Sequence, residues 1–422
     1  MLDRAYMAAS VLLRMGIGLV LLIVLARALG PTAYGFIATV FAVSTLAGLA
    51  TDFGFGAKTL RDIGARPEAG AQLVSEALSV KLTLTLAVAL IGGVAVLFAP
   101  LPSNLRLAGA VLGLAVLVGA LGDLALTAYR AVGRYGQEFW LTSWTSVAHL
   151  ALVVGAAAFT GSVIVVALAY LLSRALYTVI TLAGLTRLFP GQTLGLHRPG
   201  AIWITMRGAW RWAVDSGLNQ LLGQIDGVVV AAVFGLAGAG VYQAAARLVQ
   251  ASLGFVAIFA NVHIPRLAML FQTRSPRLAR AEVQMAVEFM ALGTAFGLFF
   301  WLGGPWITLW VLGPAYAETT VLWGGFGCFV VARYAAACFG AALTAQGRPG
   351  VRVLGQVLAI AVLVLGFAWR LPSQRLAEIP WVMTAAAVAT LITYGIAFVW
   401  RRSDRLSVRR LDRPSSPAPE QQ

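Results

Sequence analysis

Twelve apolar stretches, each long enough to cross the hydrocarbon core of a bilayer, recur along the 422-residue sequence. A crossing takes about 20 residues of helix, and within lipid only helices and closed barrels satisfy their backbone groups. The stretches are centred near Val20, Thr45, Ala89, Val116, Leu150, Ala175, Leu222, Ser252, Phe299, Phe329, Ala361 and Ala389. We therefore expect an all-α, polytopic membrane protein with about twelve transmembrane helices, the first of which is a span and not a cleaved signal peptide.

The distribution of basic residues predicts how these spans are oriented. The chain has 31 Lys and Arg residues against 16 Asp and Glu residues. Nineteen of the basic residues lie in the termini and in five loops that share one side, whereas the opposite loops hold only Arg375. This is the asymmetry of the positive-inside rule, so we expect both termini in the cytoplasm. The basic charge reports topology, and no nucleic-acid partner is expected.

Three pairs of loops recur in the same order, which indicates an internal duplication. The first span is followed by "ALGPTAYGFIA" and the seventh by "VFGLAGAGVYQA", and their glycines keep the same spacing 205 residues apart. Gly133 and Gly347 form a second pair, 214 residues apart, and the basic loops after spans two and eight form the third. Two halves with an even number of spans enter the membrane with the same polarity, so we expect a transport path between them.

This duplication also predicts the domain boundaries. Residues 1–188 are expected to form a lobe of helices one to six, and residues 204–400 a lobe of helices seven to twelve. Residues 189–203 are the expected cytoplasmic linker between the lobes. Residues 401–422 are expected to form a basic cytoplasmic tail, which is disordered because its Pro- and Ser-rich end has nothing to bury.

Span seven carries an unusual stripe of polar residues. On a helical wheel, Arg207, Arg211, Asp215, Asn219 and Asp226 occupy about a third of the circumference. An ionisable group that faces lipid costs on the order of 3 kcal/mol, so the stripe is expected to face a cavity between the halves. The alternative is that Arg207 lies at the interface and that Arg211 and Asp215 form a structural pair. Asp226 lies about four turns deeper, too far from a helix end for its side chain to reach the polar interface.

Within the spans basic residues outnumber acidic ones, which favours an anionic ligand, and arginine holds phosphate with two hydrogen bonds at once. We expect the residues that bind this ligand to be Arg14, Arg174, Arg207, Arg211, Asn219, Arg247 and Arg333. The residues expected to bind a coupling ion or to form structural ion pairs are Asp123, Asp215 and Asp226. Arg14 can equally snorkel to the cytoplasmic face, and Asp123, Arg174 and Arg333 can equally be structural partners.

No catalytic constellation accompanies these charges. The sequence has no nucleotide-binding G-x-x-x-x-G-K-[ST] loop, no H-E-x-x-H motif and no outer loop long enough to house acid and base groups. Its three histidines and two cysteines are not at metal-ligand spacing. We expect a protein that is not an enzyme and that needs no cofactor and no metal.

The loop motifs resemble those of a known family. "ARALGPTAYG" at residues 26–35, "DFG" at residues 52–54, "YRAVGRY", "QIDGVVVAAVFGLAGAGVYQAAARL", "WVLGPAYAETTVLW" and "LTAQGRPG" occur in order over nearly the whole chain. They are similar to motifs of the polysaccharide transporter family, the O-antigen and lipid-linked oligosaccharide flippases within the multidrug/oligosaccharidyl-lipid/polysaccharide exporter superfamily. The expected loop and gating residues are Gly30, Pro31, Gly35, Asp52, Gly54, Gly235 and Gly240.

The resemblance implies a function and a place. Such a protein is expected to move an undecaprenyl-pyrophosphate-linked oligosaccharide from the inner to the outer leaflet of the bacterial plasma membrane by alternating access, for surface polysaccharide biosynthesis. The expected partners are this glycan, membrane lipids, a coupling ion, which is H⁺ or Na⁺, and the polymerase or assembly proteins of the pathway. A multidrug antiporter of the same superfamily, or a membrane-embedded glycosyltransferase or ligase, is the alternative.

Overall fold

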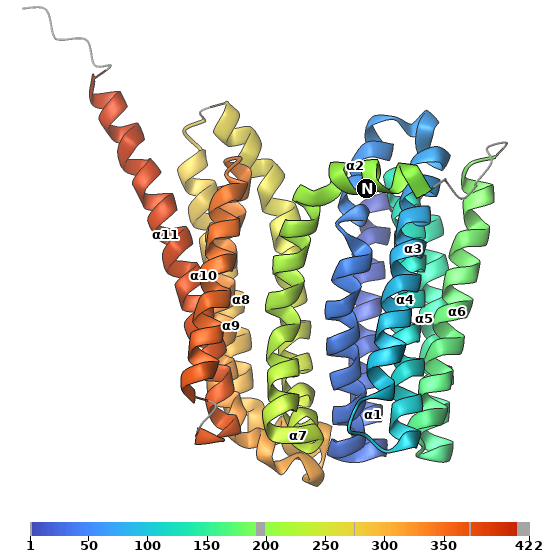
Figure 1. The fold of residues 1–422 in the computed structure, drawn as a ribbon. Helices are drawn as coiled ribbons and strands as arrows, with labels where there is room; N and C mark the ends of the chain where they lie inside the picture. Colours follow the sequence, from blue (N-terminus) through green and yellow to red (C-terminus); the bar gives the residue numbers. More distant parts are fainter. Residues whose placement is uncertain (1, 191–198, 274, 371–372, 412–422) are drawn as a thin grey trace, which may run out of the picture. The chain divides into compact units, whose positions relative to one another are not determined.

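The computed structural model describes residues 2–190, 199–273, 275–370 and 373–411, in which every regular element is a helix (Figure 1). The long helices are α1 (Leu2–Asp52), α2 (Phe55–Ala65), α3 (Gly70–Leu97), α4 (Ser103–Ala131), α5 (Tyr135–Thr160), α6 (Val163–Leu188), α7 (Pro199–Gln272), α8 (Leu278–Trp306), α9 (Trp323–Ala345), α10 (Pro349–Arg370) and α11 (Ile379–Leu411). Shorter helical turns are Pro67–Ala69, Ile307–Leu312, Pro314–Leu322 and Leu376–Glu378. The predicted all-α class is confirmed.

Ten helical segments of the described chain are long and apolar enough to cross a membrane. Two of them, Leu12–Asp52 in α1 and Gly217–Gln272 in α7, have 41 and 56 residues, about twice the length of one span. Each is interrupted by a glycine with non-helical backbone, Gly30 in α1 and Gly235 in α7. Each therefore contains two of the expected spans, and the ten segments agree with about twelve transmembrane helices.

The glycines at equivalent positions of the two halves share one backbone conformation. Gly30 has φ 75° and ψ 173°, and Gly235 has φ 67° and ψ −173°. Gly133 and Gly347 also match, with φ of 75° and 70°. Positive φ strains every residue that has a Cβ atom, so glycine is the residue that turns the chain there without cost. Two of the three loop pairs recognised in the sequence therefore share a backbone conformation at their glycines.

The kinked parts of α1 and α7 pack directly against each other. A Cβ atom added to Gly35 would overlap the carbonyl oxygen of Leu236, and one added to Gly240 would overlap the carbonyl oxygen of Pro31. Small residues that let two helix backbones approach closely are the usual means of association between transmembrane helices. The two motifs recognised as copies of each other therefore form one contact.

The chain divides into two compact units. The first comprises Met1–Ala251, Leu302–Trp323 and Arg370–Ile379, and the second comprises Ser252–Trp301, Gly324–Trp369 and Pro380–Gln422. The lobe and linker boundaries expected from the duplication stay a prediction, since residues 191–198 of the linker lie outside the described chain. Helix α11 continues to Leu411, past residue 401 where the tail was expected to begin, and the residues beyond are not described.

Inside the first unit, the short helix α2 is fixed by one apolar face. Phe55 and Ile63 are fully buried, Phe55 against Val80 and Leu124 and Ile63 in the cluster around Tyr129. Burial of each of these two side chains contributes about 2 kcal/mol. Helix α2 is therefore held against α3 and α4 even though it does not cross the membrane.

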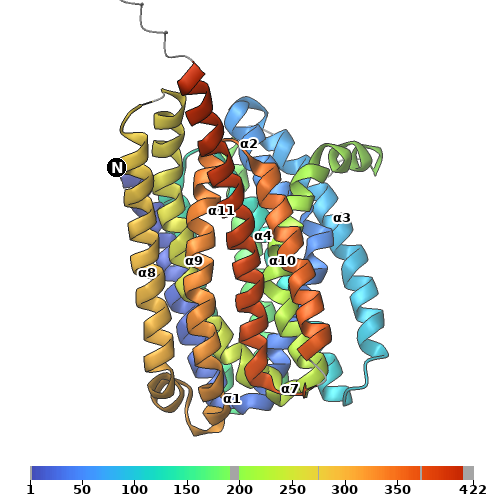
Figure 2. The same cartoon turned by 90° about the vertical axis from the view of Figure 1, so that its left-hand side faces the viewer.

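In the second unit, α8, α9, α10 and α11 run side by side (Figure 2). Gly297 of α8 lies so close to α9 that a Cβ atom there would come within 2.9 Å of the Gly327 carbonyl oxygen. The Tyr334 hydroxyl donates a hydrogen bond of 2.7 Å to the Ser252 carbonyl oxygen. The Tyr334 ring packs near the rings of Phe289 and Phe296. Within a membrane the hydrophobic effect does not hold helices together, so close backbone packing and hydrogen bonds between helices do so instead.

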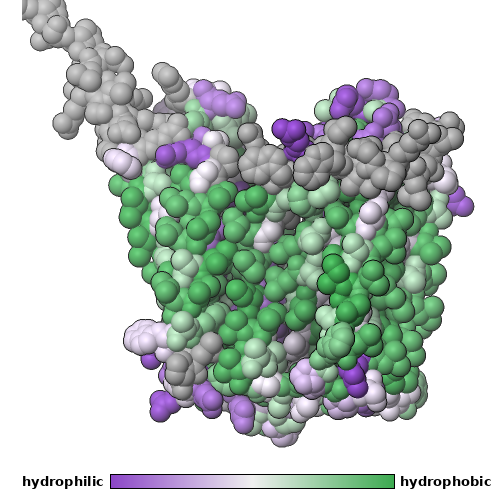
Figure 3. Space-filling model, viewed as in Figure 1, coloured by the Kyte–Doolittle hydropathy of each residue, from purple (hydrophilic) through white to green (hydrophobic). Residues whose placement is uncertain are grey.

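The surface agrees with a membrane protein. In the face shown in Figure 3, hydrophobic side chains occupy the middle of the helices, and hydrophilic ones gather toward their ends. Large apolar side chains are widely exposed, as shown by Leu90, Phe159 and Trp400. Such exposure is rare in a water-soluble protein but is expected of helices that contact lipid.

Candidate functional site

A charged cavity of about 290 Å³ lies among the first four helices of the first unit. Its lining residues are Arg14 and Asp52 from α1, Gly56 from α2, Lys81 from α3, and Asp123, Leu124, Leu126, Thr127 and Arg130 from α4. All these helices except α2 are segments that can cross a membrane. Ionisable side chains at such depth are expensive to place, so a cavity that gathers five of them is the best candidate for a functional site.

One pair of opposite charges in the cavity is almost closed off from solvent. Lys81 Nζ lies 2.6 Å from Asp52 Oδ1, and the Lys81 side chain is only 3% exposed. Asp52 ends α1, directly before the turn at Phe53 and Gly54, which both have positive φ. That turn directs the chain into α2 and leaves the Asp52 carboxylate facing α3. The pair therefore joins the end of α1 to the middle of α3.

A second group of charges is centred on Glu138 of α5, which is 1% exposed. Arg130 donates two hydrogen bonds to Glu138 Oε1, of 2.9 Å from Nε and 2.7 Å from Nη2. Arg14 Nη2 lies 3.7 Å from the same oxygen, beyond hydrogen-bond distance. Arg130 is thus committed to Glu138, whereas the Arg14 side chain, 36% exposed, retains donors for another ligand.

A third contact involves Asp123, which accepts a hydrogen bond of 2.8 Å from the Tyr177 hydroxyl of α6. Arg14 and Arg174 both lie close enough to this hydroxyl to interact with it electrostatically. The structure therefore brings together three of the residues predicted from the sequence, Arg14, Asp123 and Arg174. With Lys81, Arg130, Asp52 and Glu138, the neighbourhood contains four basic and three acidic side chains.

Arg174 is the least engaged of these cations. Its side chain packs against Gly119 of α4, where a Cβ atom would lie 3.1 Å from Arg174 Cδ. Within the described part of the chain it makes no hydrogen bond and no ion pair. An arginine inside a transmembrane helix with free donors is suited to bind an anion, because its guanidinium holds two oxygens in a fixed geometry.

The residues predicted on span seven are only partly described. Arg207 and Asn219 are exposed on α7. The side chains of Arg211 and Asp215 lie outside the described residues. Asp226 is 2% exposed and accepts a hydrogen bond of 2.6 Å from the Tyr242 hydroxyl. Asp226 therefore has a hydrogen-bond partner within α7, on the other side of the interruption at Gly235.

The last two predicted cations are not among the residues that line the cavity. Arg247 is half-buried, with hydrogen bonds of 3.4 Å to Gln250 and Gln224. Arg333 belongs to α9 in the second unit and is also half-buried, with no hydrogen bond or ion pair to the residues that the structure describes. Neither lines the charged cavity.

Sequence reasoning missed Lys81, Arg130, Glu138 and Tyr177 as site residues. Lys81 had a usable signal, since it is the one lysine within the apolar stretch "LSVKLTLTLAVAL". Arg130 lies near the end of α4 and Glu138 near the start of α5, on either side of a loop, where charge is ordinary. Tyr177 gave no signal, because a tyrosine in a transmembrane helix is common. Only the packing of α4 on α5 and α6 shows what these residues contact.

Next to the cavity, α2 carries its own charge cluster outside the membrane-crossing segments. Lys58 Nζ donates to Asp62 Oδ2 at 2.9 Å, and Arg61 Nη2 donates to Asp62 Oδ1 at 2.6 Å. Burial alone raises the pKa of the Asp62 carboxyl, but the hydrogen bonds and charges of Lys58 and Arg61 outweigh it, and the pKa is lowered below its ordinary value. Asp62 is therefore charged at neutral pH.

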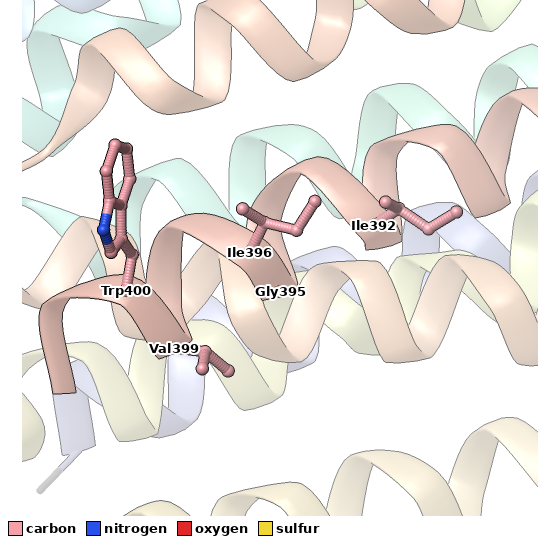
Figure 4. A pocket seen from close by; sticks show the side chains of 5 residues that line it. All are labelled: Ile392, Gly395, Ile396, Val399 and Trp400. Atoms are coloured by element: carbon pink, nitrogen blue, oxygen red, sulfur yellow. The ribbon is translucent and has the colours of Figure 1, made fainter. Parts of the chain in front are cut away.

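A wide hollow on α11 is of a different kind (Figure 4). It is lined by Ile392, Gly395, Ile396, Val399 and Trp400, all from one helix. The side chains of Ile396, Val399 and Trp400 are more than half exposed. A ligand site needs polar groups that fix orientation, and these residues offer none apart from the tryptophan ring nitrogen. This surface is suited to contact with lipid.

Comparison with solved structures identifies the fold. The chain is similar to an inward-facing multidrug resistance MATE family transporter of the MOP superfamily, with 17% identity, 95% of this chain and 99% of that chain covered, and a TM-score of 0.67. An outward-facing structure of a MATE family transporter matches with 18% identity, 97% coverage of both chains and a TM-score of 0.65. A MOP superfamily transporter from Pyrococcus furiosus, described by a reverse polarity of its binding pocket that suggests a different function, matches with 17% identity, 96% and 97% coverage and a TM-score of 0.65. No curated protein matches the chain.

The chain shares its fold with these solved structures, and its described part contains ten helical segments able to cross a membrane, as expected of a multi-pass membrane protein. A family model described as polysaccharide biosynthesis protein matches residues 3–271, well over half of the sequence, so the chain belongs to that family. The family predicted from the loop motifs is confirmed.

Proposed function

We propose that this transporter moves an undecaprenyl-pyrophosphate-linked oligosaccharide from the inner to the outer leaflet of the bacterial plasma membrane, for surface polysaccharide biosynthesis. The observation that supports the proposal most is the presence of two arginines with free donors, Arg14 and Arg174, beside a polar cavity within membrane-crossing helices. Membership of the polysaccharide biosynthesis family supports the class of substrate.

The physical task of such a protein is to lower the cost of moving a charged headgroup through hydrocarbon, which is prohibitive for an unpaired charge. Arginine is suited to this task, because bidentate hydrogen bonds to phosphate oxygens replace the water that the headgroup loses. Lys81 and Arg130 form ion pairs with the carboxylates of Asp52 and Glu138, so these two cations do not add to the binding of the headgroup phosphates. The prenyl chain stays in lipid, and the sugar needs only a polar, hydrated path.

Alternating access is the mechanism that fits this fold best. The similar solved transporters include inward-facing and outward-facing conformations. A cavity that opens to one leaflet at a time lets the headgroup cross without a continuous pore. We extend the same proposal to topology, with both termini in the cytoplasm as the basic loops require.

The test is a flipping assay with the full-length protein in liposomes that contain a fluorescent prenyl-pyrophosphate-linked sugar. A membrane-impermeant quencher reports the labelled headgroup in the outer leaflet over time. We expect Arg14→Ala to lower the flipping rate about tenfold or more, since a hydrogen bond to a charged group contributes about 1.5–3 kcal/mol. Arg14→Lys is expected to recover part of the rate, because lysine keeps the charge but not the two-pronged geometry.

The matched control is Arg66→Ala, which removes an exposed arginine outside the cavity, directly after α2. It should leave the rate unchanged. Equal rates for Arg14→Ala and Arg66→Ala would remove Arg14 from the binding site, and a wild-type protein that does not flip the labelled lipid at all would refute the proposed substrate.

A multidrug exporter is the second candidate, and one observation favours it. Asp123 lines the cavity and is exposed, with a hydrogen bond from Tyr177 and no ion pair in the described chain. A carboxylate in that position can attract an organic cation. The same liposomes, loaded with a fluorescent organic cation, separate the two candidates. Cation efflux that is lost in Asp123→Asn, without flipping of the glycolipid, would favour the multidrug function.

A further inference from the structure

Helix α5 carries a buried polar face that the transport site does not explain. Glu138, Thr142, Thr145 and His149 are all at most 8% exposed. Their spacing of four, three and four residues places them on one side of the helix. The face runs from the end near the charged cavity to the middle of α5, a rise of about 16 Å. Beyond His149 the buried residues on the same side are Val153 and Ala157, which are apolar.

Three atoms on this face are buried without a hydrogen-bond partner among the residues that the structure describes. They are Glu138 Oε2, Thr142 Oγ1 and His149 Nε2. The Thr145 hydroxyl, in contrast, donates to the Leu141 carbonyl oxygen at 2.8 Å. Buried polar atoms in proteins nearly always have a partner, and an unpartnered one needs an explanation such as bound water. Three on one helix face point to a common partner.

The geometry around His149 fixes what that partner must offer. Ser173 Oγ lies 2.8 Å from the Tyr170 carbonyl oxygen and 2.7 Å from His149 Nδ1. When the Ser173 hydroxyl donates to that carbonyl oxygen, it accepts from Nδ1, so the proton of the neutral ring is on Nδ1 and Nε2 is an acceptor. Glu138 Oε2 is an acceptor as well, whereas the Thr142 hydroxyl can donate and accept. A chain of water molecules meets all three needs.

Charged and titratable neighbours face both ends of this polar face. At the His149 end, α6 provides Tyr170, whose ring packs edge-on at 4.8 Å, and Arg174, which interacts electrostatically with His149. At the Glu138 end, α1 provides Arg14 and α4 provides Arg130. In the neutral form of the His149 ring with its proton on Nδ1, the Nε2 atom is available to accept a hydrogen bond.

We propose that the polar face of α5 is a water-binding site, in which a file of water molecules runs from Glu138 past Thr142 to His149 and hydrates Arg174. The file enters from the charged cavity and ends at His149, because Val153 and Ala157 offer no hydrogen bonds beyond it. Hydration accounts for the position of an arginine inside a transmembrane helix without an ion-pair partner in the described chain. The inference holds whichever substrate the transporter carries.

The test is water-edited solid-state NMR of the full-length protein in bilayers with ¹⁵N-labelled histidine. The sequence has three histidines, so the spectrum is simple, and the signal lost in His149→Asn identifies His149. We expect an unprotonated Nε2 and rapid magnetisation transfer from water to this ring. Thr142→Val keeps the shape of the side chain but removes the hydroxyl, and should slow this transfer at least threefold.

Thr145→Val is the matched control, because the Thr145 hydroxyl is already satisfied within α5. It should leave transfer to His149 unchanged. Absence of water transfer to His149 in the wild-type protein, or equal transfer in the two threonine variants, would overturn the proposal. The melting temperature gives a second readout: Thr142→Val lowers it if the hydroxyl binds water, and a rise would show that the hydroxyl is buried dry. If neither variant folds, the wild-type spectrum alone decides.

Discussion

The Lys81 ammonium group and the Asp52 carboxylate illustrate, at the scale of single residues, what a charge inside a transmembrane helix requires. Lys81 is buried, and its ammonium group lies 2.6 Å from the Asp52 carboxylate. Replacement of a buried ion pair by apolar residues is often tolerated, whereas removal of one partner leaves an uncompensated charge. The two changes to this pair should therefore differ strongly in their effect on stability.

We expect Asp52→Asn to lower the free energy of unfolding by about 3 kcal/mol, because it leaves the Lys81 charge buried without a partner. The double variant Asp52→Asn with Lys81→Met should recover most of this loss. Thermal unfolding in detergent, followed for both single variants and the double variant, gives the coupling between the two residues. Additive losses in the double variant would show that the two side chains do not depend on each other.

The contacts of Asp62 predict how the stability of the protein depends on pH. Its pKa is lowered in the folded protein, so the stability gained from its contacts with Lys58 and Arg61 is present above the unfolded pKa and is lost as pH falls through the folded pKa. Asp62→Asn should therefore melt at a lower temperature than the wild type at pH 7. The difference should begin to shrink as pH falls below about 4, near the unfolded pKa, and should vanish only below the lowered folded pKa.

Melting curves of the two proteins from pH 7 down to pH 3 check this prediction. Glu318→Gln, at an exposed site in the short helical turn Pro314–Leu322, serves as the control and should follow the wild type. A gap between Asp62→Asn and the wild type that stays constant over the whole range would mean that the charge of Asp62 does not contribute.

At the scale of elements, the sequence was most informative where a residue type has one structural use. The four glycines matched between the halves, Gly30 with Gly235 and Gly133 with Gly347, all have positive φ. Hydropathy likewise located the spans, because only length and apolarity are needed to cross lipid. The partners across helices could not be predicted, because which face of α4 meets α5 depends on side-chain packing that has no period in the sequence.

The close contact of α1 and α7 predicts a sharp difference between two glycines. Gly35→Ala should destabilise the protein or prevent its insertion, because the new methyl group would overlap the Leu236 carbonyl oxygen on α7. Gly48→Ala is the control, since Gly48 lies in the same helix with open space around it, and alanine is the better helix former by up to about 1 kcal/mol. Expression level and melting temperature of the two variants give the comparison. Equal behaviour would show that the two helices can separate at Gly35.

At the scale of the whole molecule, the sequence alone led to the class of protein and to its family, but to only part of the candidate site. Arg14, Asp123 and Arg174 were predicted, and the structure places them together around Tyr177. Lys81 and Glu138 were not predicted, because a single charge in a sequence carries no sign of the partner that neutralises it. Those partners lie on other helices: Asp52 is 29 residues from Lys81 along the chain, and Arg130 is 8 residues from Glu138.

The proposed transport should respond to the membrane potential. If the headgroup crosses as an anion from a negative interior, each charge gains about 2.3 kcal/mol per 100 mV, or roughly 40-fold in the equilibrium distribution. A potassium diffusion potential imposed on the liposomes should therefore shift the labelled glycolipid toward the positive side. Liposomes without a potential are the control, and a distribution that does not change with the sign of the potential would show that net charge does not cross.

The contact between Gly35 and Gly240 also limits how the two helices that carry it can move. Two helix backbones in direct contact, without side chains between them, cannot slide along each other. Any such shift would bring the peptide groups of one helix into steric overlap with those of the other. They can still tilt, since rotation about the point of contact leaves the touching atoms in place. The contact of α1 with α7 therefore acts as a pivot point. A small change in the angle between the helices there becomes a large displacement at their far ends.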